Sequence, residues 1–200
     1  MATPVLFHFD FSSPYGYFAA QRIDTLAARH GRAVDWRPML LGVAFKQTGM
    51  APLTQVPLKG DYSTHDFDRT ARFHRIDFRM PSRFPIPTQA PGRLVTWLKS
   101  TQPLAAVPVA KALYRAYFVD DRDISAPDVV ADVAAAGGVG RDAARAALDD
   151  PQVKDAFRRG VEEAIAMGVF GSPYVVVDGE PFWGFDRFDQ IDRWLATGGF

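Results

Sequence analysis

The chain has 200 residues, of which 48% are hydrophobic and 23% are charged. This composition is typical of one folded domain, or of a small domain that carries a large insertion, and it argues against long disordered stretches. Lysine plus arginine equals aspartate plus glutamate at 23 each, so no overall charge attracts nucleic acid or an anionic membrane, and we expect neither partner.

The first residues, 1–4, lead directly into an apolar segment and lack the basic start and long apolar core of a signal peptide. No apolar run approaches the roughly 18 residues that a membrane-spanning helix requires. The chain contains no cysteine, which is compatible with a reducing compartment. Together these features predict a cytoplasmic protein.

The N-terminal segment predicts a β-α-β unit. Residues 5–11 are rich in β-branched and aromatic side chains and too short for a helix, which favours a buried strand. Ser13 and Pro14 then predict a helix start, with a hydroxyl cap followed by proline in the first turn, and Gly31 ends that helix. Residues 33–38 return as a second strand, so the connection is expected to be right-handed.

The middle of the chain predicts loops followed by helices. Between residues 40 and 91 proline and glycine recur, and residues 66–75 show a helical pattern between loops, which indicates a loop-rich insertion. Apolar spacing with breaks at proline and glycine predicts further helices over residues 93–100, 107–119, 127–136 and 141–148. A longer helix over residues 152–167 follows, with Gly168 as its C-terminal stop.

The C-terminal segment predicts a hairpin and a last helix. Asp178-Gly179 separates two apolar runs at residues 174–177 and 180–183, which is a strong hairpin signal. An amphipathic helix is expected over residues 186–195. The order of elements is therefore β-α-β, a helical block, and α-β-β-α.

This order predicts an α/β fold in which a thioredoxin-like domain carries an all-helical insertion. The thioredoxin-like domain would comprise residues 1–39 and 152–200, and the inserted helical domain residues 40–151. Ser13-Pro14 then stands where a thioredoxin-like protein begins its Cys-x-x-Cys motif. Since the chain has no cysteine, sulfur chemistry at this place requires a thiol that a ligand supplies.

In that fold Ser13 would meet Ser172-Pro173, the place of a cis-proline before a strand. The backbone N–H and C=O of the residue before such a proline can pair with an extended peptide. The helix N-terminus at Ser13 favours a thiolate, and the Ser13 hydroxyl can donate to it. Such a charge-assisted bond contributes roughly 1.5 to 3 kcal/mol, enough to lower a thiol pKa by about one to two units. The alternatives are a helix cap at Ser13 and a simple turn at Ser172-Pro173.

Residues 9–15, 168–173 and 178–187 resemble the corresponding segments of the 2-hydroxychromene-2-carboxylate isomerases, which are related to the kappa-class glutathione transferases. The likeness covers nearly the whole chain, including Thr48-Gly49 and residues 56–62. It implies a DsbA-like thioredoxin fold with a helical insertion, bound glutathione, a role in aromatic compound catabolism and usually a homodimer.

The resemblance also implies roles for individual residues. Ser13 would support the glutathione thiolate, and Ser172, before Pro173, would pair with the cysteinyl part. Phe185 and Asp186 resemble the pair that receives the γ-glutamyl end, where Asp186 can meet the ammonium group. Asp186 as a helix N-cap is the alternative.

Further side chains are weaker candidates for this site. Trp183 is a candidate for glutathione binding, with a core position as its alternative. The family often has asparagine after Thr/Ser-Gly, but Met50 stands at that place. Lys46 and Lys59 are nearby cations for a substrate carboxylate, although a solvated lysine is the alternative for each. The four histidines show no metal-ligand spacing, so we expect no metal site.

These observations favour a glutathione-dependent isomerase that acts on an aromatic carboxylate by reversible thiolate addition and bond rotation. A kappa-like glutathione transferase or peroxidase is the first alternative. The second is a cysteine-free thioredoxin-like module that only binds peptides or partner chains. The sequence does not identify the physiological substrate, because the variable insertion forms that side of the site.

Overall fold

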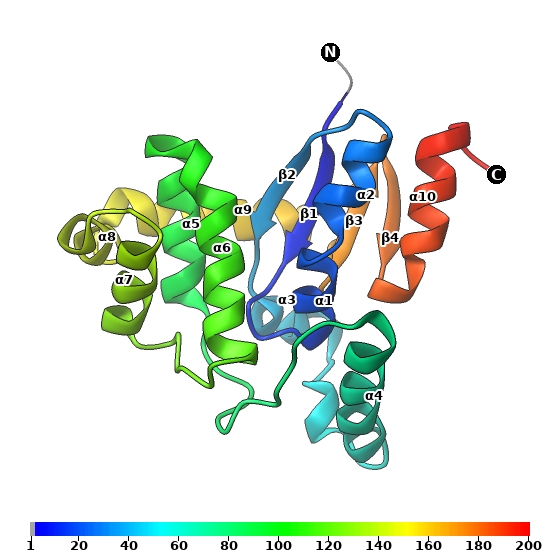
Figure 1. Cartoon of the computed structure of the whole chain (residues 1–200), viewed down its shortest axis with the longest axis horizontal. Coiled ribbons are helices and arrows are strands. Elements are labelled where there is room, and N and C mark those ends of the chain that lie inside the picture. The colour runs from blue at the N-terminus through cyan, green and yellow to red at the C-terminus, as the bar shows by residue number, and fades with distance from the viewer. Residues whose placement is uncertain (1–2) are drawn as a thin grey trace.

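The computed structural model describes residues 3–200 and contains one four-stranded sheet (Figure 1). Its strands are β1 (Val5–Phe9), β2 (Val34–Pro38), β3 (Tyr174–Val177) and β4 (Glu180–Trp183). Their order in the sheet is β2-β1-β3-β4; β1 pairs with β2 in parallel and with β3 antiparallel, and β3 and β4 form the predicted hairpin. This mixed sheet confirms the predicted thioredoxin-like α/β fold.

The helical block of the insertion is also confirmed. Its helices are α5 (Gln89–Thr101), α6 (Pro103–Phe118), α7 (Pro127–Ala136) and α8 (Arg141–Ala147). They gather on one side of the sheet, while α9 (Pro151–Ala166) returns behind it and contacts both α5 and β2 (Figure 1). Among the described residues, none of the helices has the length and apolar character needed to cross a membrane.

An aromatic core joins the sheet to the insertion. The rings of Phe7 on β1 and Trp36 on β2 meet edge to face, with 4.9 Å between their centroids. Tyr114 of α6 is fully buried and lies 5.8 Å from Phe9 between ring centroids. Because one buried cluster contains side chains from both parts, the two parts stabilise each other. The division into domains stays a prediction, and residues 1–2 of its first segment lie outside the described residues.

The single helix predicted from Ser13 to Gly31 is wrong in one respect, because two short helices replace it. These are α1 (Pro14–Ala20) and α2 (Ile23–Arg29). The amide N–H groups of Gln21 and Arg22 bond to carbonyls three residues back, which tightens the turn and interrupts the helix. The chain then resumes so that α2 buries Ile23.

The stretch predicted as loop-rich is more helical than expected. It contains α3 (Leu41–Thr48), the 3₁₀ turn η1 (Leu53–Gln55) and α4 (Lys59–His74). The helix predicted over residues 66–75 begins seven residues earlier, at Lys59. Only Ser63, Phe67 and Ala71 of α4 are buried, so its first turns offer little of the apolar periodicity that predicts a helix.

His8 is an unusual member of the sheet. It lies on β1 opposite Arg37 and is 1% exposed, and within residues 3–200 neither ring nitrogen has a hydrogen-bond partner. Burial, with a smaller contribution from the cation of Arg37, lowers the pKa of His8 from 6.5 to about 4, whereas Asp35 acts in the opposite direction. His8 is therefore neutral in the folded protein at neutral pH.

We expect His8 to make the protein less stable in mild acid. The unfolded chain takes up a proton on His8 near pH 6.5, whereas the folded chain does so only near pH 4, so the loss develops between these values as the pH falls. It should reach about 3 kcal/mol of unfolding free energy. Urea unfolding of the wild type and of His8→Phe over this range measures the contribution, because all other titrating groups are common to both proteins. Parallel pH profiles would contradict it.

Candidate active site

Ser13 caps the N-terminus of α1. Its Oγ accepts the amide N–H of Gly16 at 3.0 Å, and Pro14 occupies the first turn. The residue is 5% exposed. The predicted helix start is thus confirmed, and its unpaired amide N–H groups give this end of α1 a positive partial charge.

The structure brings Ser13 and Ser172 into direct contact, although 159 residues separate them. The Ser13 hydroxyl donates to the backbone carbonyl of Ser172 at 2.8 Å. The peptide bond between Ser172 and Pro173 is cis, as predicted. No backbone hydrogen bond among residues 3–200 uses the Ser172 amide N–H. One side-chain donor and one backbone donor therefore lie at the same helix N-terminus.

Gly16 allows α1 to approach the Ser172 loop closely. A Cβ on Gly16 would lie 2.7 Å from Ser172 Oγ and 3.0 Å from Tyr114 Oη. Sequence reasoning did not single out this glycine. A signal was present, because glycine inside a helix is less favourable than alanine by roughly 0.5–1 kcal/mol and needs a reason to be there.

Asp10 holds the Ser13 and Ser172 segments together by hydrogen bonds, and sequence reasoning did not single it out as a site residue. Its buried carboxylate accepts the amide N–H of Ser12 at 2.9 Å, the amide N–H of Leu41 at 2.6 Å and the hydroxyl of Thr88 at 2.7 Å. Its own amide N–H donates to Ser172 Oγ at 2.9 Å. Burial raises the pKa of Asp10, while these hydrogen bonds oppose the shift. The sequence signal is an acid between two buried aromatics at a strand end.

The active-site end of α1 is held against α4. The Tyr15 hydroxyl donates to the carboxylate of Asp66, which also accepts from Arg69. Burial raises the pKa of Tyr15, and the carboxylates of Asp66 and Asp186 raise it further. Helix α1 also contacts residues 185–187, which follow β4.

Phe185 and Asp186 lie in the 3₁₀ turn η2 (Phe185–Arg187), which precedes α10 (Phe188–Thr197). The ring of Phe185 is buried, with its centroid 4.7 Å from that of His74 on α4. The Asp186 side chain is exposed and pairs with Arg187 at 3.4 Å. The alternative that Asp186 caps the last helix is wrong, because α10 begins two residues later than predicted. Of the pair, only Asp186 presents its side chain to solvent.

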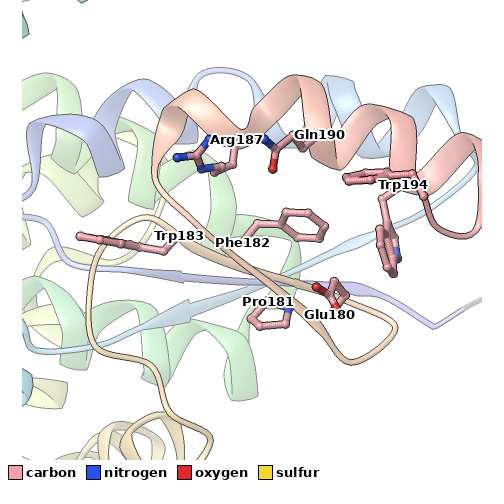
Figure 2. A pocket seen from close by; sticks show the side chains of 8 residues that line it. Glu180, Pro181, Phe182, Trp183, Arg187, Gln190 and Trp194 are labelled. Carbon is pink, nitrogen blue, oxygen red and sulfur yellow. The ribbon is translucent and has the colours of Figure 1, made fainter.

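Trp183 lies against the loop that leads to Ser172. A Cβ on Gly171 would lie 2.2 Å from Trp183 Nε1, so the indole packs directly on that glycine. Trp183 is half exposed rather than part of the core. It also borders a groove of about 490 Å³ between β4 and α10, whose other walls include Arg187 and Trp194 (Figure 2). That groove includes neither Ser13 nor Ser172, so it does not coincide with the candidate site at the two serines.

The weaker candidates lie at the edges of α3 and α4. Lys46 is in the last turn of α3, Met50 follows that helix, and Lys59 begins α4; all three are exposed. Within residues 3–200 no hydrogen bond or ion pair joins them to Ser13 or Ser172. The same part of the chain contains no cluster of three acidic or histidine side chains that could hold a metal ion.

Comparisons with known proteins agree with this architecture. A family model described as a DSBA-like thioredoxin domain matches residues 4–196. The chain is 28% identical over 205 residues to 2-hydroxychromene-2-carboxylate isomerase from Sphingobium xenophagum, covering 98% of this chain and 99% of that protein. It is 25% identical over 206 residues to glutathione S-transferase kappa 2 from Caenorhabditis elegans, covering 96% and 91%.

Solved structures show the same fold. A 2-hydroxychromene-2-carboxylate isomerase superposes with a TM-score of 0.84 at 23% identity, covering 97% of this chain and 95% of that one. The cytosolic disulfide reductase DsbM from Pseudomonas aeruginosa, determined with GSH, superposes with a TM-score of 0.68 at 16% identity, covering 97% and 96%. The resemblance predicted from the end motifs is confirmed.

Proposed function

Because the chain belongs to the DSBA-like thioredoxin family, and its relatives over nearly the whole length include isomerases and glutathione transferases, we propose that it is a glutathione-dependent isomerase. Its substrate would be an aromatic carboxylate of the kind named in its 2-hydroxychromene-2-carboxylate isomerase relatives. The observation that carries the proposal is the contact between the Ser13 hydroxyl and the Ser172 carbonyl at the N-terminus of α1, in a chain without cysteine.

The donors and acceptors at this site fit glutathione. An anionic sulfur requires hydrogen-bond donors and positive charge, which the Ser13 hydroxyl and the first turn of α1 supply. The cysteinyl backbone requires an N–H and a C=O, and Ser172 offers both. The γ-glutamyl ammonium requires an acid, and Asp186 is exposed beside the site.

When bound, glutathione would supply a thiolate that adds reversibly to the conjugated substrate, lets the bond that loses its double character rotate, and is released unchanged. The chain's own residues keep that sulfur ionised and in place. Ser13 donates to it, Ser172 and Pro173 fix the cysteinyl part, and Trp183 covers the approach to their loop. The exposed amines of Lys46 and Lys59 are the candidates for the substrate carboxylate.

The expected result is isomerisation that requires glutathione but does not consume it. Purified protein with 2-hydroxychromene-2-carboxylate should convert it only when glutathione is present, while the free thiol concentration stays constant. Product formation is followed by absorbance and the thiol by titration in the same sample. Turnover without glutathione would contradict the proposal.

Stoichiometric loss of thiol would instead favour a kappa-like transferase, which the kappa-class relatives make the second candidate. Failure of calorimetry to detect glutathione binding would favour the cysteine-free binding module. The expected homodimer, the cytoplasmic location and the absence of nucleic-acid and membrane partners stay predictions.

A further inference from the structure

The two groups proposed to bind glutathione already satisfy each other in this structure. Ser13 has one hydroxyl proton, and a carbonyl oxygen cannot donate, so the 2.8 Å contact commits that proton to the Ser172 carbonyl. The same carbonyl is the group that would accept the cysteinyl N–H. Both residues are nearly buried, at 5% and 8% exposure, so few solvent contacts compete with this hydrogen bond.

Both residues of this hydrogen bond are also held by other contacts. The Gly16 amide N–H fixes Ser13 Oγ at 3.0 Å, and the Asp10 amide N–H fixes Ser172 Oγ at 2.9 Å. The close packing of Gly16 on Ser172 Oγ restricts the loop further. Turning the Ser13 hydroxyl hydrogen toward another acceptor therefore requires only rotation about its Cβ–Oγ bond and no backbone movement.

We propose that glutathione binds by exchange with the Ser13–Ser172 hydrogen bond: the cysteinyl N–H takes over the Ser172 carbonyl, and the Ser13 hydroxyl turns to the thiolate. This inference rests on the proposed function. The exchange couples binding of the cysteinyl N–H to ionisation of the thiol. When the Ser13 hydroxyl turns away, the nearly buried Ser172 carbonyl loses its donor unless the ligand brings an N–H.

The coupling specifies a ligand class. The N–H and the sulfur must belong to the same cysteinyl residue, with the nitrogen acylated as in glutathione. The N–H then replaces the Ser13 hydroxyl as the donor to the Ser172 carbonyl, and the sulfur accepts a hydrogen bond from that hydroxyl. A simple thiol without that N–H leaves the Ser13–Ser172 hydrogen bond closed and is not ionised by Ser13. The site therefore selects acylated cysteinyl thiols at the ionisation step as well as at the binding step.

The test compares glutathione with an ester analogue in which oxygen replaces the cysteinyl N–H. Ultraviolet absorbance of the thiolate, measured against pH with saturating protein, gives the thiol pKa of each bound ligand relative to the free ligand. Glutathione should show a pKa lowered by about one to two units, and the analogue a shift smaller by at least about one unit. Equal shifts would overturn the exchange and leave the proposed function standing, whereas no glutathione binding would overturn both.

Two variants serve as matched controls. Ser13→Ala lacks the hydroxyl that would turn from the Ser172 carbonyl to the thiolate, so the two ligands should show equal pKa shifts. Ser172→Ala keeps the backbone carbonyl, so the difference between the ligands should persist. A persistent difference in Ser13→Ala would also overturn the inference.

Discussion

Replacing Ser13 with alanine is expected to lower glutathione-dependent turnover about 10- to 100-fold. A hydrogen bond to a charged group contributes roughly 1.5–3 kcal/mol, and each 1.4 kcal/mol corresponds to a factor of about ten in rate or in ionisation. The loss should appear together with a higher pKa of the bound thiol, because the Ser13 hydroxyl is the side-chain donor that we propose for the thiolate. Raising the pH should therefore partly restore the turnover of the variant.

The neighbouring hydroxyl provides the control for this experiment. Ser12 precedes the same helix, and its Oγ accepts the amide N–H of Ile86 at 3.2 Å rather than facing Ser172. Ser12→Ala should keep the thiol pKa of bound glutathione at the wild-type value. Because Ser13→Ala also removes the N-cap of α1, at a cost of about 1 kcal/mol of stability, turnover is compared at a temperature where both variants are folded. A wild-type thiol pKa in Ser13→Ala would exclude the assigned role.

Replacing Asp10 with alanine should destabilise the fold by about 3 to 5 kcal/mol, the largest stability effect that we expect from one side chain here. The substitution leaves the amide N–H groups of Ser12 and Leu41 and the hydroxyl of Thr88 without their buried acceptor. These three donors belong to the Ser13 turn, the start of α3 and the start of α5. One carboxylate thus joins the Ser13 side of the candidate site to two segments of the insertion.

Urea unfolding with a constant m-value measures this loss, and hydrogen exchange locates it. Exchange of the Ser12 and Leu41 amide protons should accelerate more than exchange in β1. Asp10→Asn, which keeps one acceptor oxygen and the side-chain volume, should lose less stability than Asp10→Ala. Asp68→Ala, an exposed acid on α4, is the control and should change stability by less than about 0.5 kcal/mol. A loss below about 1 kcal/mol for Asp10→Ala would show that water replaces the carboxylate.

Several elements could be predicted from the sequence because their signals are local. The Ser13-Pro14 helix start and the Asp178-Gly179 hairpin depend on the dihedral preferences and capping groups of adjacent residues, and both appear where expected. The helices of the insertion likewise follow from apolar spacing and proline breaks. Local signals did not reveal the interruption between α1 and α2 or the early start of α4, because tight turns and exposed polar helices leave no apolar period.

The sequence by itself therefore determined the fold class, the absence of the protein's own thiol and the two segments that carry the candidate site. Only the tertiary structure showed that Ser13 donates to the Ser172 carbonyl, that Asp10 accepts from three separate segments and that Gly16 allows their close approach. Apart from the local contact between Asp10 and Ser12, these contacts join residues 31 to 159 positions apart, or depend on a distance between packed elements. No periodicity or motif encodes such a distance, because it results from how the sheet and the insertion pack on each other.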